Sequence, residues 1–247
     1  MTAPALRLDG VCRAFGGLQA VDGVSLEVLP GERRALIGPN GAGKTTLFNL
    51  IAGALPVSAG RIALFGQDVT GAPSHRRAAL GLARTFQITN LFPDLTVLEN
   101  CLLAVQAHTP TRFAMLRPVR RYPALLERAR ATLTSLELGA MGDAVVKNLS
   151  HGEQRQLEIA LALAGRPKVL LLDEPTAGLS PAESRLMAGL LRRLDPAITV
   201  LIIEHDMDIA LELSERVAVL HYGRVIADGP REHVKADPRV KEIYLGA

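Results

Sequence analysis

The sequence predicts an α/β fold in which helices cover a parallel β-sheet. Short apolar runs occur in "RRALIG", "KVLLLD" and "TVLIIE", and a segment with helical spacing follows each of them. Parallel strands are buried on both faces and need long crossover connections, so this order is typical of a parallel sheet. The 247 residues, of which 48% are apolar, are enough to bury a sizeable core.

Other segments predict a second sheet and a helical insertion. "LRLDGV", "GVSLEV" and "GRIALFG" alternate apolar and polar residues and predict antiparallel strands, while "RVAVLH" predicts one further strand. Residues 96–107 and 122–137 have helical spacing with no strand between them. We therefore expect one domain over 1–247. Its core and β-subdomain cover about 1–90 and 166–247, and its helical subdomain covers about 91–165. The three prolines within 107–123 predict an extended loop there.

Composition excludes several classes of protein. The net charge of +3 is too small to argue for nucleic-acid binding. No apolar run approaches the roughly 18 residues that span a bilayer, and the first residues lack a secretory signal pattern. Cys12 and Cys101 predict neither a disulfide framework nor a metal site. We expect a cytosolic protein of bacterial type.

The strongest motif is "GPNGAGKT" at 38–45, which matches G-x-x-x-x-G-K-[ST] between a predicted strand and a predicted helix. Gly41 and Gly43 let successive N–H groups turn inward toward phosphates. Lys44 places a cation at the β- and γ-phosphates, and Thr45 offers a hydroxyl to Mg²⁺. The alternative is a glycine-rich turn without function, which the flanking strand and helix disfavour. The candidate nucleotide-binding residues here are Asn40, Gly41, Ala42, Gly43, Lys44, Thr45 and Thr46.

Two further strands carry polar residues at their carboxyl ends, where ligands bind in open parallel sheets. Asp173 and Glu174 follow "KVLLL", so Asp173 can reach the metal through water and Glu174 can orient or deprotonate an attacking water. His205 follows "TVLIIE" and is a candidate contact for the γ-phosphate. Each feature alone is also compatible with an ordinary strand end.

The segment "LSHGEQRQLEIA" at 149–160 is compatible with a simple helix start or with a site that binds a phosphate. Ser150 and Glu153 form an S-x-x-E capping box, which predicts a helix that begins near Gly152. A helix N-terminus can also bind an anion, but most such patterns are only caps. Phe15 and Gln87 are weaker still: by themselves they indicate a core aromatic and a surface glutamine.

Taken in order, these motifs resemble an ATP-binding subunit of ABC transporters over essentially the whole chain. The order is P-loop, glutamine loop, S-x-G helix start, D-E strand, "TAGLSP" turn and strand-end histidine. The resemblance implies a P-loop NTPase core of the RecA-like type, ATP hydrolysis, and Mg²⁺ held by Thr45, Gln87 and Asp173. It also implies catalytic roles for Glu174, His205 and Gln87, and stacking of adenine on Phe15.

The resemblance also gives a second meaning to "LSHGE", which corresponds to the family's L-S-G-G-Q. Two cassettes pack head to tail in this family, so Ser150 and Gly152 are implied to hold the γ-phosphate of ATP bound to a partner chain. His151 and Glu153 depart from the family pattern, and Ser180 stands where many members have Asp. These departures put the details of communication between the two sites in doubt.

"LARTFQITNLFPDLTVLEN" and the ending "DPRVKEIYLG" look like the branched-chain amino-acid importer type. Importers of urea or short amides, and the lipopolysaccharide exporter, have similar motors. The implied partners are transmembrane permease subunits, a second ATP-binding subunit in a hetero- or homodimer and, indirectly, a periplasmic solute-binding protein. The implied location is peripheral, on the cytoplasmic face of the inner membrane.

A non-transport ABC ATPase acting on nucleic acid or ribosomes is the main competing class. It is disfavoured because there is one P-loop and because Lys44 and Ser150 lie too close together for a long coiled-coil insert. Nothing except the P-loop supports a small-molecule kinase. Arg112, Arg117, Arg120 and Arg121 indicate a solvated loop or, as the sharper alternative, a contact with a permease or anionic lipids.

Overall fold

The computed structural model describes residues 3–85, 91–113 and 121–245. The chain divides into two compact units. The core unit comprises Met1–Arg84, Lys168–Pro175 and Asp195–Ala247, and the helical unit comprises Thr85–Pro167 and Thr176–Leu194. The subdomain boundaries expected from the sequence, at about 91 and 165, stay a prediction.

A six-stranded sheet forms the centre of the core unit. Its order is β10-β9-β3-β8-β7-β6, with five parallel strands and β10 antiparallel at one edge. The strands are β3 (Arg33–Ile37), β6 (Leu82–Arg84), β7 (Val169–Asp173), β8 (Thr199–Ile203), β9 (Arg216–His221) and β10 (Arg224–Pro230). Every residue of β7 and β8 is buried, as the apolar runs predict. The predicted parallel sheet is confirmed.

The core unit also contains the antiparallel sheet that the alternating segments predict. Its order is β2-β1-β4-β5, formed by β1 (Leu6–Phe15), β2 (Leu18–Val28), β4 (Ala59–Leu64) and β5 (Gln67–Asp68). Leu6 and Leu8 are buried, whereas Arg7 and Asp9 between them are exposed. This period of two places one face of β1 in the core and the other in solvent.

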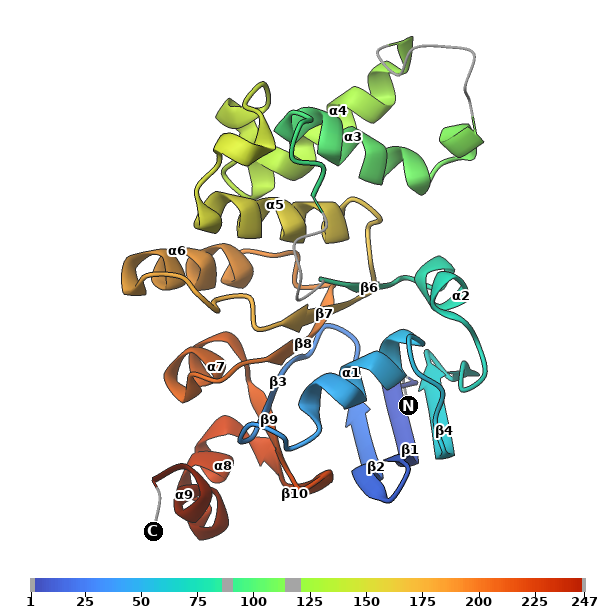
Figure 1. Cartoon of the computed structure of the whole chain (residues 1–247), viewed down its shortest axis with the longest axis vertical. Helices are drawn as coiled ribbons and strands as arrows, with labels where there is room; N and C mark the ends of the chain where they lie inside the picture. Colours follow the sequence, from blue (N-terminus) through green and yellow to red (C-terminus); the bar gives the residue numbers. More distant parts are fainter. Residues whose placement is uncertain (1–2, 86–90, 114–120, 246–247) are drawn as a thin grey trace. The chain divides into compact units, whose positions relative to one another are not determined.

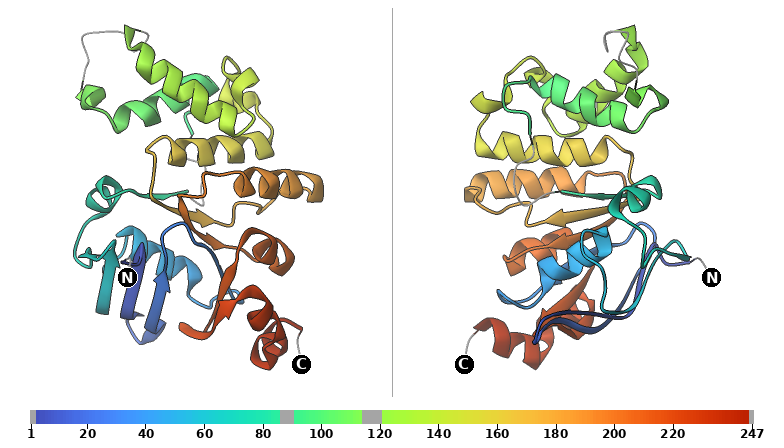
Figure 2. Two further views of the ribbon diagram at one scale, coloured as in Figure 1. Left: turned by 180° about the vertical axis from the view of Figure 1, so that it is seen from behind. Right: turned by 45° about the vertical axis from the view of Figure 1, so that its right-hand side comes forward.

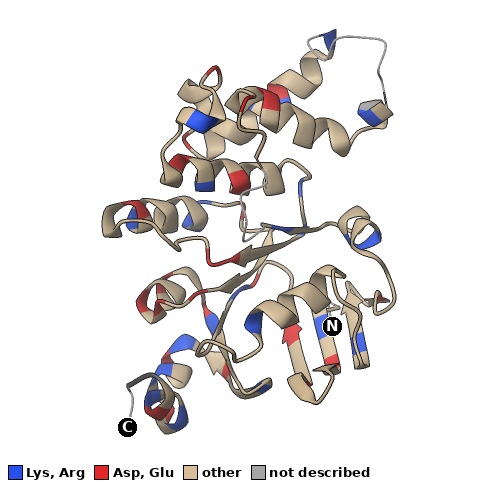
Figure 3. Ribbon diagram, in the orientation of Figure 1, with Lys and Arg blue, Asp and Glu red and all other residues tan. Residues whose placement is uncertain are grey.

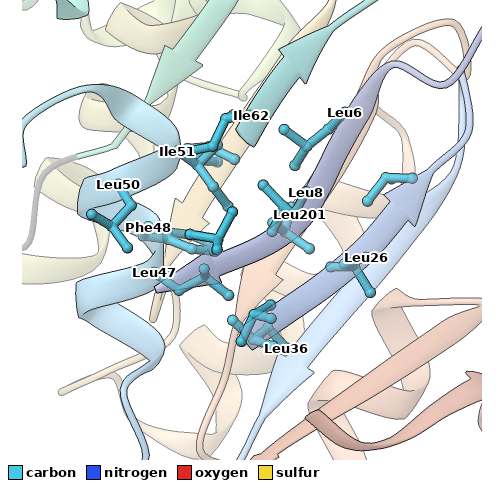
Figure 4. Close-up of a cluster of buried hydrophobic side chains, with 14 of the residues drawn as sticks. Leu6, Leu8, Leu26, Leu36, Leu47, Phe48, Leu50, Ile51, Ile62 and Leu201 are labelled. Carbon is cyan, nitrogen blue, oxygen red and sulfur yellow. The ribbon is translucent and has the colours of Figure 1, made fainter. Parts of the chain in front are cut away.

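Helix α1 (Lys44–Ala52) packs its apolar side into a core that both sheets share. Figure 4 shows Leu47, Phe48 and Ile51 of α1 facing Leu8 of the antiparallel sheet and Leu36 of β3. Because α1 begins at Lys44, this packing also fixes the position of the P-loop that precedes it. The core therefore fixes the start of α1 and the loop before it.

The two faces of β3 point into different apolar clusters. Leu36 belongs to the cluster around α1, while its neighbours Ala35 and Ile37 pack with residues of three C-terminal helices. Those helices are α7 (Met207–Leu213), α8 (Arg231–Ala236) and α9 (Pro238–Leu245). A further short helix, α2 (Ser74–Ala79), precedes β6. Helices thus cover both faces of the sheet, which is the predicted α/β arrangement.

The helical unit contains α3 (Val97–Ala107), α4 (Pro123–Ser135), α5 (His151–Leu163) and α6 (Pro181–Arg192). Helices α5 and α6 run side by side in Figures 1 and 2. The helices predicted at 96–107, at 122–137 and after Ser150 are confirmed. The loop predicted at 107–123 is only partly extended, because Pro110–Phe113 forms a 3₁₀ turn. Residues 114–120, which include Arg117 and Arg120, lie outside the described residues.

Acidic and basic residues are interspersed along the ribbon of each unit (Figure 3), in keeping with the small net charge. In the described part of the chain, every helix is too short or too polar to cross a membrane.

Candidate functional site

The carboxyl ends of four neighbouring strands carry the candidate site. The P-loop follows β3, Asp173 ends β7 and Glu174 comes directly after it, His205 follows β8, and Tyr222 follows β9. These strands are parallel, so their carboxyl ends share one edge of the sheet. A cavity of about 470 Å³ opens there. It is lined by Phe15, Leu18, Gln19, Ala20, Asn40, Gly41, Ala42, Gly43, Lys44, Thr45, Thr46, Glu174, His205, Tyr222 and Gly223.

The P-loop has a backbone shape that requires glycine. Gly41 and Gly43 have φ values of 79° and 101°, in the left-handed region. A Cβ on Gly43 would lie 2.3 Å from the carbonyl oxygen of Ala20, which leaves no room for a side chain. Gly43 is also the N-cap residue of α1 and provides no side-chain cap. The first N–H groups of α1 are therefore available to an anion in the cavity.

Lys44 is 5% exposed, and its ammonium group is held by the P-loop itself. Its Nζ donates to the carbonyl oxygens of Gly38, at 2.7 Å, and Pro39, at 3.0 Å. Burial lowers the pKa of Lys44, while the negative charges of Glu174 and Asp173 act in the opposite direction. Thr45 and Thr46 are half-buried on the same wall. The loop thus presents a cation and two hydroxyl groups together.

Glu174 and His205 meet at this edge although 31 positions separate them in the sequence. Nε2 of His205 lies 2.5 Å from Oε1 of Glu174, and the two side chains are 46% and 20% exposed. Glu174 has a left-handed φ of 48°, and its backbone N–H donates to the carbonyl oxygen of Ile203 at 2.9 Å. That bond ties the end of β7 to β8. A carboxylate and an imidazole therefore share one wall of the cavity.

Asp173 is fully buried, and it bonds to a residue that the sequence analysis missed. Arg84, the last residue of β6, donates from Nη2 to Oδ2 of Asp173 at 2.9 Å. The Arg84 guanidinium also donates to Oδ1 of Asn49 on α1 at 2.5 Å. The sequence offered one clue, which is that Arg84 ends the short segment "LAR". This segment forms β6, a parallel neighbour of β7, so the carboxyl ends of both strands lie at the same edge of the sheet.

The cavity also contains more aromatic surface than the sequence analysis anticipated. Phe15 is 43% exposed and lines the cavity, so it is not the core aromatic that its sequence context alone indicates. The Arg13 guanidinium lies 4.7 Å from the centre of the Phe15 ring, within cation–π range. Leu18 and Tyr222 line the same cavity, and nothing in their sequence context had singled them out.

Ser150 and Gly152 belong to the helical unit, whereas every residue that lines the cavity belongs to the core unit. The predicted cap is confirmed: Glu153 N–H donates to Ser150 Oγ at 3.3 Å, and Ser150 N–H donates to Glu153 Oε2 at 2.7 Å. The carboxylate of Glu153 thus turns back to its own helix. Ser180 makes the same capping box with Glu183 at the start of α6.

The oxygen-bearing side chains expected to hold a magnesium ion differ in their access to the cavity. Mg²⁺ prefers oxygen and usually keeps several waters, so one hydroxyl and one carboxylate are a typical protein contribution. Thr45 offers such a hydroxyl on the cavity wall. Asp173, the expected carboxylate, is fully buried, accepts a bond from Arg84 and is not part of the cavity lining. Among the described residues, no group of three or more His, Cys, Asp and Glu could hold a metal by itself. Gln87, the third expected ligand, lies outside the described residues.

Comparisons with known proteins point in one direction. The model of the ABC transporter family matches residues 21–177, and that of the branched-chain amino acid ATP-binding cassette transporter matches residues 224–247. BraF of Pseudomonas aeruginosa and LivG of Escherichia coli are both high-affinity branched-chain amino acid transport ATP-binding proteins. They are 39% and 38% identical to this chain, over 100% of it and 99% of each relative.

Solved structures that are similar to this chain are also ATP-binding cassettes. The ADP conformation of an ATP-binding cassette of an ABC transporter superposes with a TM-score of 0.88 at 34% identity and covers all of both chains. A dimeric cassette in a post-hydrolysis state, bound to ADP and Pi, gives a TM-score of 0.76 at 26% identity. That match covers 92% of this chain and 98% of the other.

Proposed function

The chain belongs to the ABC transporter family, and on that premise we propose that it drives the import of branched-chain or other hydrophobic amino acids. It is an ATPase whose hydrolysis is coupled to transport. Support for the solute class comes from the C-terminal match at 224–247 and from the names of BraF and LivG. This match favours the amino-acid importer over the urea, short-amide and lipopolysaccharide alternatives.

One observation carries the proposed chemistry: a single cavity brings Lys44, Glu174 and His205 together at the carboxyl edge of the sheet. The P-loop N–H groups and Lys44 bind the β- and γ-phosphates of ATP. Phe15 stacks on the adenine, while Thr45, Asp173 and Gln87 hold Mg²⁺. When bound, the metal neutralises charge on the phosphate oxygens.

Glu174 orients the attacking water and accepts its proton as the water oxygen bonds to the γ-phosphorus. The bond from that phosphorus to the bridging oxygen breaks, so the products are ADP and inorganic phosphate. His205 lies close enough to Glu174 to fix its carboxylate and contact the γ-phosphate. Glu174 and His205 are thereby partners of each other before ATP arrives.

Two substitutions test this assignment. Lys44→Ala should abolish tight MgATP binding, because the cation that offsets the phosphate charge is lost; Lys235→Ala, an exposed lysine on α8, is the control. Glu174→Gln should bind ATP but hydrolyse it roughly 10²- to 10⁴-fold more slowly. Wild-type nucleotide affinity in Lys44→Ala would refute the site. Near-normal turnover in Glu174→Gln would mean that another residue is the general base.

Cassettes of this family dimerise and work with transmembrane permeases, and we propose specific roles in that assembly. Ser150 and the N–H of Gly152 hold the γ-phosphate of ATP on a partner cassette, which is either a second copy or a non-identical subunit. The complex then lies on the cytoplasmic face of the membrane, where a permease is supplied with solute by a periplasmic binding protein. ATPase activity in vesicles should rise when that binding protein carries a branched-chain amino acid.

Ser150→Arg tests the contact in trans. The variant should keep the first ATP contact of the isolated chain but lose closed-dimer formation and hydrolysis. Thr96→Arg is the matched control, because Thr96 caps α3 with the same capping box in the same unit. Both variants lose a cap that contributes about 0.5–2 kcal/mol, so only a loss specific to Ser150→Arg reports the phosphate contact. Loss of the first ATP contact in Ser150→Arg would place this helix start in its own chain's site.

A further inference from the structure

The turn between β9 and β10 contains an aromatic residue in an unfavourable backbone conformation. β9 ends at His221 and β10 begins at Arg224, which leaves Tyr222 and Gly223 as a two-residue hairpin turn. Their φ values are 44° and 77°, so both central residues are left-handed, as a type I′ turn requires. Asn-Gly is the favoured pair for this turn, and a bulky residue at the first position is strained. Tyrosine is therefore a poor choice for the turn alone.

The turn is firmly attached to the P-loop and to β2. Gly223 N–H donates to the carbonyl oxygen of Ala42 at 2.9 Å, and Gly223 accepts from Asp22 N–H at 2.8 Å. Arg224 forms an ion pair with Asp22 at 2.6 Å. The ring centres of His221 and Tyr222 are 4.2 Å apart, so a neighbouring side chain also supports the phenol. The position of Tyr222 relative to the P-loop is thus set by several bonds.

The order of strands places Tyr222 at the nucleoside end of the cavity. Glu174 and His205 follow β7 and β8, on one side of β3, and they define where the γ-phosphate lies. Tyr222 follows β9, on the other side of β3. The nucleoside must extend away from the γ-phosphate, and the P-loop lies between. Tyr222 lines the cavity and is nevertheless 81% exposed, so its ring is free to be covered by a ligand.

We propose that Tyr222 is a nucleoside-binding residue, a second aromatic contact for the ribose and base in addition to Phe15. This inference rests on the proposed ATP site. The ring covers apolar surface of the nucleoside, and this contact compensates for the strained backbone at the turn. An aromatic contact of this kind changes affinity by roughly 3- to 10-fold.

Tyr222→Asn separates binding from folding, because asparagine suits the left-handed position of the turn. The melting temperature of the variant should not fall, while the Kd for ATP measured by calorimetry should rise about 3- to 10-fold. The affinity for inorganic triphosphate, which lacks a nucleoside, should stay unchanged. Phe65→Asn is the matched control: Phe65 and Gly66 form the same left-handed pair between β4 and β5, with φ values of 49° and 79°, outside the cavity lining.

The absence of tryptophan from the sequence provides an independent readout. Tyr222→Trp introduces a single indole whose emission should change on addition of ATP and remain unchanged with inorganic triphosphate. Phe65→Trp should give no change with either. Wild-type ATP affinity in Tyr222→Asn overturns the inference, and so does an equal loss for ATP and triphosphate, which would mean damage to the P-loop. If the unsubstituted protein fails to bind ATP, the proposed function fails first and this contact fails with it.

Discussion

The buried ion pair between Arg84 and Asp173 is the most informative place to perturb the site. The Arg84 side chain is 14% exposed and that of Asp173 is fully buried, with 2.9 Å between Nη2 and Oδ2. Arg84→Met keeps most of the apolar volume of the side chain and removes its charge. The carboxylate of Asp173 then keeps its burial and loses the charged donor Arg84, and Oδ1 of Asn49 loses a donor.

The expected loss is large because the remaining charge stays in a poorly solvated place. Removing one partner of a buried pair costs about 3–5 kcal/mol. For a chain of this size each kcal/mol lowers the melting temperature by about 2–4 °C, so a fall on the order of 10 °C is expected. Adding Asp173→Asn to Arg84→Met removes the buried charge that Arg84 balances and should restore at least about half of the lost stability.

Thermal unfolding of the four proteins in this double-mutant cycle, without nucleotide, measures the coupling. Lys147→Met is the control, because Lys147 pairs with Asp94 at 3.0 Å while the two side chains are 59% and 81% exposed. Such a pair contributes under about 1 kcal/mol. If Arg84→Met is no more destabilised than Lys147→Met, or if Asp173→Asn makes it worse, the assignment of Arg84 as the charge partner of Asp173 is wrong.

Arg77, Gly38 and Cys101 lead to the remaining predictions. Arg77 donates to the carbonyl oxygens of Leu50, Ile51, Thr70 and Ala72, so Arg77→Met should cost about 2–4 kcal/mol in denaturant unfolding, and exposed Arg76→Met under about 0.5. Gly38→Ala should lose ATP binding in a calorimetric titration, because its Cβ would lie 2.1 Å from the carbonyl oxygen of Leu220; Gly17→Ala, with open space, should not. Burial raises the pKa of Cys101 to about 12, so Cys101 should resist alkylation at pH 8 until unfolding. The buried thiol stabilises the folded state fully below the unfolded thiol's pKa of about 8.5, and this stabilisation is lost as the pH rises toward 12. The free energy of unfolding of Cys101→Ala should therefore fall less than that of the unsubstituted protein between these two pH values.

The sequence predicted the parts of the fold that repeat a simple pattern. β7 and β8 are short apolar runs that end in polar residues, and alternation identified β1. Capping chemistry located the start of α5, because Ser150 and Glu153 satisfy each other's backbone groups at short range. The P-loop needed only its own glycines and lysine. In each case the information lies within about ten consecutive residues.

Contacts between distant segments could not be predicted in this way. Arg84 bonds to Asp173 across 89 positions, and the turn at Gly223 bonds to Ala42 across 181. No local pattern in "LAR" or "HYG" distinguishes a buried partner or a cavity wall from an ordinary strand end. The 3₁₀ turn at Pro110–Phe113 was not predicted for a related reason, because a proline at the start of a turn is compatible with either an extended or a helical continuation.

Two residues that line the cavity have strained backbone conformations, and hydrogen bonds to neighbouring elements maintain them. Glu174 and Tyr222 both have left-handed φ values, and both line the cavity at the ends of parallel strands. Such conformations cost about 1–3 kcal/mol each and persist only where neighbouring bonds enforce them. The bond from Glu174 N–H to Ile203 supplies that constraint at one site, and the bond from Gly223 N–H to Ala42 supplies it at the other. Both constraints run to β8 or to the P-loop, the same elements that position His205 and Lys44. The proposed hydrolytic carboxylate and the proposed nucleoside contact are therefore fixed to the P-loop and β8 before a nucleotide arrives, which reduces the ordering that binding itself must accomplish.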